Sequence, residues 1–105
     1  MPYDKKELEY RTTKGLTGFI HGQQYRQMNQ NQKESYVTGV IDGLMFAFAV
    51  TKQTSSQQWL EECIKGVPVN QLTAIVTKYI TNNPELSQAT ANGLVFNALV
   101  SLRNE

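Results

Sequence analysis

The feature that most constrains this chain is an apolar-rich stretch at residues 29–51, NQNQKESYVTGVIDGLMFAFAVT, which no proline interrupts. With a helical spacing of 100° per residue, four large side chains share one face: Val37, Ile41, Leu44 and Phe48. Four more widen this face at its sides: Tyr36, Val40, Ala47 and Val50. A last set points away from it, with Met45 near the edge: Asp42, Phe46 and Ala49. A helix that is apolar on two sides must be covered on both. We therefore expect a central helix with the protein's own core on one side and another surface, such as a second copy, on the other.

The segments before the central helix carry fewer apolar residues. Residues 1–14 mix charges of both signs, and we expect a loose arm or a short helix there. Residues 17–28 are predicted to form a first helix, with Phe19, Ile20 and Tyr25 facing inward. Asn29 then fits the N-cap of the central helix, because its side chain can accept a hydrogen bond from the first helical turn.

Local signals divide the rest of the chain into three further helices. A polar connection at 51–55 leads to a short helix that ends at Lys65, with a serine at 55 or 56 as its cap. Gly66 then suits the position after a helix end that needs a positive φ. Pro68 suits the first turn of the next helix, which stops at Asn82-Asn83-Pro84. The last helix is predicted at residues 86–102.

Each of these helices has a face that can be buried. In the short helix, the apolar residues are Trp59, Leu60, Cys63 and Ile64. In the next helix they are Leu72, Ile75, Val76, Tyr79 and Ile80. In the last helix they are Ala91, Leu94, Val95, Ala98, Leu99 and Leu102, while Phe96 and Val100 form a second apolar line. No segment alternates with a period of two, so the fold class is all-α: one compact domain of four to five helices over residues 1–105.

Composition narrows the classes of function. The net charge of +1 favours neither nucleic acid nor an anionic membrane as a partner. No signal peptide is visible and no stretch is long and apolar enough to span a membrane, because the run at 37–50 is short and holds Asp42. A cytoplasmic location and a periplasmic one with a trimmed signal peptide therefore both remain open.

No catalytic or metal-binding pattern stands out. His21 is the single histidine and Cys63 the single cysteine. A Cys–His pair across the fold would make a thiol enzyme or a small hydrolase, but Cys63 lies on an apolar helix face that favours a buried structural thiol. The adjacent Glu61 and Glu62 diverge on a helix and cannot act as a pair. We expect neither an enzyme nor a bound cofactor or metal.

The central helix also contains Gly39-Val40-Ile41-Asp42-Gly43. Each glycine costs about 1 kcal/mol of helix stability relative to alanine. We expect both to be there because another backbone approaches closely. Asp42 is either a rim carboxylate that keeps an apolar face soluble or an interface carboxylate that accepts a hydrogen bond from a partner.

Several short motifs resemble one protein family. They are Cys63-Ile64-Lys65-Gly66-Val67, Gln71-Leu72, Ile75-Val76, Lys78-Tyr79-Ile80, Asn83-Pro84-Glu85 and Ala98-Leu99, together with Tyr36-Val37-Thr38-Gly39-Val40-Ile41-Asp42-Gly43. In order and spacing they are similar to the helical immunity proteins that protect bacteria from amidase effectors of type VI secretion. Family members commonly carry two cysteines. At the first of those positions this chain reads Lys33-Glu34-Ser35.

The resemblance implies an all-helical, often dimeric periplasmic protein that binds a peptidoglycan-cleaving amidase and blocks its active site. From the helical periodicity we assign a dimer or partner interface to Asp42, Met45, Phe46, Ala49, Phe96 and Val100. Polar loops at 51–56 and 82–87 are candidates for contact with the effector, since loops can enter a cleft. The residues concerned are Thr54, Ser55, Asn82, Asn83 and Glu85. The alternative is a helical accessory or structural domain of the same fold that inhibits nothing.

Overall fold

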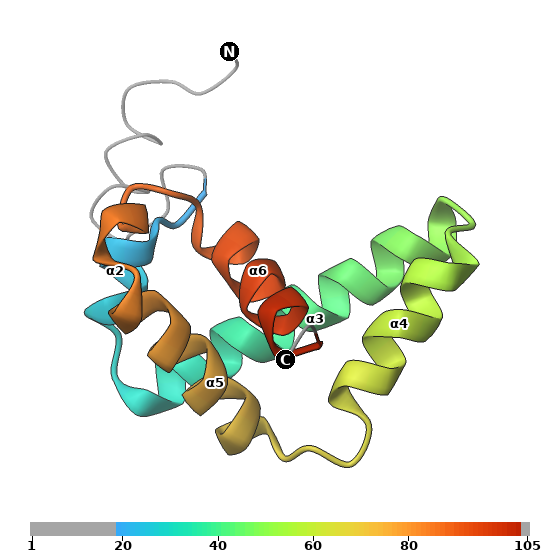
Figure 1. Ribbon diagram of the computed structural model, residues 1–105, viewed down its shortest axis with the longest axis horizontal. Coiled ribbons are helices and arrows are strands. Elements are labelled where there is room, and N and C mark those ends of the chain that lie inside the picture. Colours follow the sequence, from blue (N-terminus) through green and yellow to red (C-terminus); the bar gives the residue numbers. More distant parts are fainter. Residues whose placement is uncertain (1–18, 104–105) are drawn as a thin grey trace, which may run out of the picture.

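The computed structural model describes residues 19–103, which fold as helices joined by short connections (Figure 1). In chain order these are α2 (Gly22–Arg26), α3 (Gln30–Val50), α4 (Thr54–Ile64), α5 (Val69–Asn82), the 3-10 turn η1 (Pro84–Leu86) and α6 (Ala91–Arg103). The predicted all-α class is confirmed. Within residues 19–103 the only pairing of extended backbone is a single antiparallel bridge between His21 and Thr90. No helix in that range is long and apolar enough to cross a bilayer.

The central helix begins where its cap predicts. The Asn29 side chain accepts a hydrogen bond of 2.8 Å from the backbone N–H of Gln32, and the Gln32 side chain accepts one of 2.9 Å from the Asn29 N–H. This reciprocal capping box satisfies two N–H groups that the helix itself leaves without acceptors. Thr51 closes the other end, and its hydroxyl donates to the carbonyl oxygen of Ala47 at 2.6 Å. Helix α3 therefore runs for 21 residues without a break.

The boundaries of α4 and α5 match the predicted signals in part. Gly66 has the expected positive φ, 73°, directly after α4, and Pro68 is the N-cap of α5. The predicted serine caps of α4 are wrong: the helix starts earlier, at Thr54, with Gln53 as its N-cap. Lys52 in the preceding turn has a φ of 57°, which reverses the chain tightly enough for α4 to begin at once.

The last helix is shorter than predicted, because long-range hydrogen bonds hold the segment before it. The N–H of Ala91 donates to Ile20 at 2.6 Å, and the N–H groups of Gly22 and Gln23 donate to the carbonyls of residues 89 and 87. Backbone groups used in this way are not available to a helix. Residues 84–90 therefore form η1 and a turn, and α6 starts only at Ala91.

The first predicted helix is also reduced, to the five residues of α2. Tyr25 is buried and Ile20 half-buried, as expected, but Phe19 is 65% exposed because it precedes the helix. The predicted arm at 1–14 and the first two residues of the predicted helix at 17–28 lie outside the described residues.

The core is formed by one face of each long helix. The buried apolar residues are Tyr25, Val37, Ile41, Leu60, Cys63, Leu72, Val76, Ile80, Ala91, Leu94, Val95, Ala98 and Leu99. Thr73 is also fully buried, and its hydroxyl donates to the carbonyl of Val69 at 2.7 Å. The predicted core arc of α3 was too wide, since Ala47 is exposed and Val50 is 59% exposed. In Figure 1 the C-terminal part of α3 extends beyond α5, so less of its surface is covered. Leu102 in α6 is likewise 37% exposed.

Candidate binding surface

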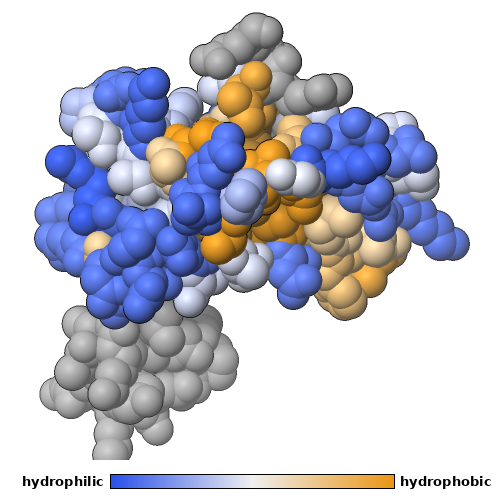
Figure 2. All heavy atoms as spheres, turned by 90° about the horizontal axis from the view of Figure 1, so that it is seen from below, coloured by the Kyte–Doolittle hydropathy of each residue, from blue (hydrophilic) through white to orange (hydrophobic). Residues whose placement is uncertain are grey.

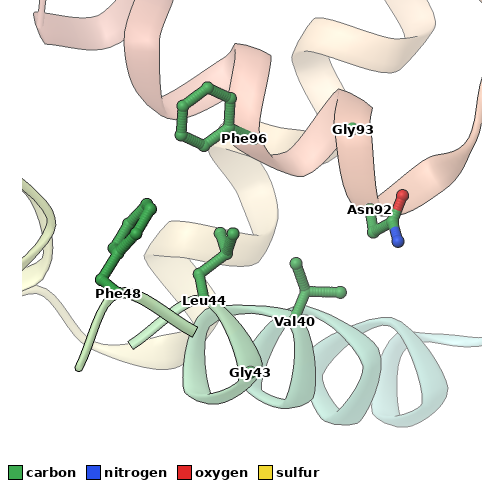
Figure 3. A pocket seen from close by; sticks show the side chains of 7 residues that line it. All are labelled: Val40, Gly43, Leu44, Phe48, Asn92, Gly93 and Phe96. Carbon is green, nitrogen blue, oxygen red and sulfur yellow. The ribbon is translucent and has the colours of Figure 1, made fainter. Parts of the chain in front are cut away.

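An apolar groove separates the C-terminal half of α3 from α6 (Figure 3). Its volume is about 530 Å³, and it is lined by Val40, Gly43, Leu44, Phe48, Asn92, Gly93 and Phe96. Figure 3 shows the side chains of Val40, Leu44 and Phe48 pointing from α3 towards α6. No lining residue is charged, so this groove fits an apolar side chain and offers little to an ionic ligand.

A second hollow adjoins the groove at the end nearer α4. It shares Phe48 and Phe96 with the groove and adds Trp59, Val100 and the polar residues Gln53, Ser55 and Ser56. The rings of Trp59 and Phe96 meet edge to face, with centroids 5.5 Å apart. Figure 2 shows the molecule from below, with apolar residues in the middle of that view and hydrophilic surface on both sides. An apolar centre within a polar rim is the usual anatomy of a protein-binding surface.

The structure divides the predicted interface residues into separate groups. Phe96 and Val100 are half-buried; Phe96 lines both the groove and the hollow beside it, and Val100 lines the hollow. Met45 is half-buried and packs against the core. In contrast, Asp42, Phe46 and Ala49 are exposed, and Phe46 lies two residues from both Leu44 and Phe48 and therefore about 160° from each around α3. The predicted set thus covers two faces, the groove and the outer side of α3.

The predicted partner loops are placed differently from expectation. Thr54 and Ser55 are not loop residues, because they form the first turn of α4. Residues 51–53 alone connect α3 to α4, at the tip of a helical hairpin that projects from the rest of the molecule (Figure 1). Asn82 is the last residue of α5, and Glu85 lies in η1. The Asn83 side chain is half-buried and donates to the Tyr79 carbonyl at 2.7 Å.

His21 and Cys63, the pair considered for catalysis, are not brought together. His21 precedes α2, where its backbone N–H donates to the side chain of Gln24 at 2.8 Å. Cys63 is buried on α4, and α2 and α4 lie at opposite ends of the molecule in Figure 1. Between residues 19 and 103, no group of three or more histidine, cysteine or acidic residues is arranged to hold a metal ion.

The perturbed ionisable groups lie away from the groove. Burial raises the pKa of Tyr25 above its usual value of 10.0, and the hydrogen bond with Thr77 opposes this rise. Burial also raises the pKa of Tyr36, whose ring meets that of Tyr25 at 6.1 Å. The Lys33 ammonium lies 5.6 Å from the Tyr25 ring centroid. This cluster joins α2, α3 and α5, so its role is to hold the fold together.

The sequence signal for the groove was incomplete. Leu44 and Phe48 fall on the core stripe of α3, and Trp59 on the apolar face of α4, yet all three are half-buried and line the groove or the hollow beside it. The one sequence feature that pointed here was the second apolar line of α6, Phe96 and Val100.

Together, the fold and this surface define a small helical protein with an open apolar face of the kind that binds other proteins. A family model described as Rap1a immunity proteins matches residues 11–102. The chain therefore belongs to the Rap1a immunity protein family. Immunity proteins of this kind bind a secreted effector and are typically not catalytic. Comparison with curated proteins and with solved structures finds no match to this chain.

Proposed function

We propose that this immunity protein binds and blocks a peptidoglycan-cleaving amidase delivered by type VI secretion. The family match over residues 11–102 is the main support for the proposal, because immunity proteins of this kind bind an effector. The amidase as target is supported by the sequence motifs between Tyr36 and Leu99. Peptidoglycan lies in the periplasm, so an inhibitor of such an enzyme would meet it there. A homodimer is part of the same proposal, supported by the exposed apolar side of α3.

The hairpin tip is our candidate for the contact with the amidase. Lys52 is exposed and held at a φ of 57°, and the exposed Thr54 and Ser55 follow it in the first turn of α4. A narrow, polar projection can enter an enzyme cleft that a flat helix face cannot reach. Asn82, Asn83 and Glu85 form the second candidate. The half-buried, hydrogen-bonded Asn83 makes that segment less able to enter a cleft.

The direct test uses the amidase encoded by a gene next to that of this protein. The purified immunity protein should form a complex with it in gel filtration and inhibit its release of peptidoglycan fragments in proportion to the amount added. If no complex forms and hydrolysis continues, the accessory-domain interpretation replaces the inhibitor.

A matched pair of variants tests the tip. Lys52→Glu should weaken inhibition at least about tenfold if the tip is the centre of the contact, since truncating a hot-spot residue costs about 2 kcal/mol or more and about 1.4 kcal/mol is already tenfold. Lys65→Glu makes the same change of charge at an exposed residue beyond the other end of α4, and inhibition should stay unchanged. Equal effects of both substitutions would show that net charge, and not the tip, determines binding.

A further inference from the structure

Trp59 of α4 borders two hollows of different chemistry. The first is the hollow beside the groove, which we call the aromatic hollow; its volume is about 420 Å³, and its aromatic lining residues are Phe48, Trp59 and Phe96. The second, which we call the acidic hollow, is lined by Ser55, Gln58, Trp59, Glu61 and Glu62. Ser55, Trp59 and Glu62 share one face of α4, because they are spaced four and three residues apart. Along this face the surface therefore changes from aromatic to acidic at a single ring.

The hairpin tip by itself is too small to hold an enzyme. A standard interface covers about 800 Å² and about 20–30 residues on each partner, whereas only residues 51–53 form the tip. A tip that enters the amidase cleft brings the rim of that cleft against the surface directly behind it. The aromatic hollow begins there, because Gln53 and Ser55 belong to its lining. The same approach therefore presses part of the amidase onto the aromatic hollow.

The aromatic hollow favours an apolar side chain. None of the described residues that line it is charged, so a charged group placed there would lose its water without meeting a counter-charge. An apolar side chain gains free energy by leaving water. The rings of Trp59 and Phe96 are already held edge to face at 5.5 Å, so little ordering is needed to receive it. Three polar side chains of the lining can bond the backbone of the segment that carries it: Gln53, Ser55 and Ser56.

We propose that the aromatic hollow binds a large apolar side chain of the amidase, and that a basic side chain beside it on the amidase lies against Glu61 and Glu62. Both glutamates are exposed, so a lysine or arginine can reach them, and a positive group opposite them makes the two surfaces complementary in charge. The face of the Trp59 ring attracts the same cation. This contact rests on the proposed function. It adds to the hairpin tip the surface behind it and the chemistry that the amidase must present.

A pair of α6 variants places the same carboxylate inside and outside the aromatic hollow. Val100→Asp should raise the Kd of the complex with the amidase of the neighbouring gene at least about tenfold, because an apolar side chain would strip the carboxylate of its water. Asn97→Asp lies at an exposed position outside this lining and should leave the Kd unchanged. Circular dichroism establishes that both variants fold. A folded Val100→Asp protein of unchanged affinity would overturn the contact.

Charge reversal tests the basic neighbour. Glu62→Lys should weaken the complex at least about threefold at low salt, and the loss should shrink at high salt, as expected for exposed charges. Glu85→Lys makes the same change in η1, beside α2 at the opposite end of the molecule from α4 (Figure 1), and should have no effect. Full affinity of Glu62→Lys, or equal losses for both variants, would refute the pairing of a basic side chain with the acidic hollow.

A fluorine probe tests the contact without altering the hollow, and so remains decisive where Val100→Asp does not fold. Trp59 is the only tryptophan of the chain, so protein labelled with 5-fluorotryptophan gives one fluorine-19 NMR resonance. Unlabelled amidase should move this resonance and reduce its shift between H2O and D2O, which measures the solvent exposure of the ring.

The outcomes separate this contact from the proposed function. A complex that forms in gel filtration while the Trp59 ring stays exposed would overturn the contact and leave the inhibitor intact. Absence of any complex would overturn both. A ring that loses its exposure in the protein alone, as the protein concentration rises, would make a second copy the occupant of the hollow and would also overturn the contact.

Discussion

At the scale of single residues, close packing between α2 and α6 determines where substitutions are tolerated. Leu94 is 1% exposed, and a Cβ on Gly22 would lie 2.8 Å from its Cδ1 atom. The two helices approach this closely because residue 22 has no side chain. Protein interiors respond to changes of even one methylene group. Near Leu94, a larger side chain would therefore clash and a smaller one would leave a cavity.

Leu94→Ala should lower the free energy of unfolding by about 2–5 kcal/mol, because it removes buried methyl groups and leaves a cavity. Urea or guanidinium unfolding followed by circular dichroism measures the loss. Leu102→Ala is the matched control in the same helix, and its effect should be much smaller because Leu102 is 37% exposed. Equal losses for the two variants would mean that the core stripe of α6 is misplaced.

At the scale of the elements, local signals predicted some helix starts and stops but not what covers each helix. Asn29, Gly66 and the proline at 84 act on their own neighbours, and the boundaries they predict are close to those observed. The delayed start of α6 depends on backbone hydrogen bonds between residues 87–91 and residues 20–23, which no local pattern encodes. The groove likewise joins residues 40–48 to residues 92–96, so neither segment alone could reveal it.

Helix α4 should be the most easily opened of the four long helices. Among the described elements it packs mainly on α3, whereas α5 packs on α2, α3, α6 and η1. Regions with few tertiary contacts open with smaller free energies. Hydrogen–deuterium exchange read by mass spectrometry should show protected amides of 54–64 exchanging at least about tenfold faster than those of 69–82, a difference of about 1.4 kcal/mol. Equal rates would mean that both helices open only with the whole fold.

At the scale of the whole molecule, one buried aromatic cluster connects three helices. The hydroxyls of Tyr25 and Thr77 lie 2.9 Å apart, which joins α2 to α5, and the Tyr36 ring brings in α3. Burial of both tyrosines disfavours their charged forms, so their pKa values are raised in the folded state. Ionisation of this cluster is therefore coupled to unfolding of the entire domain.

Stability should fall as the pH rises above the ordinary tyrosine pKa of 10.0. Below that pH both states keep their phenolic protons. Above it the unfolded chain ionises first, binds fewer protons than the folded state and is favoured. The slope is at most about 1.4 kcal/mol per pH unit for each tyrosine. Denaturant titrations at increasing pH measure it, and the double variant Tyr25→Phe, Tyr36→Phe should be less sensitive than the wild type. An unchanged slope would exclude these two groups as its source.

The turn between α3 and α4 lowers the conformational stability of the protein. Lys52 holds a left-handed backbone conformation that glycine adopts without strain, and for a residue with a side chain this costs about 1 kcal/mol or more. Glycine at this position would therefore give a more stable protein with the same hairpin. Keeping lysine there gives up a little stability and places an exposed, positively charged side chain in the turn at the tip of the hairpin.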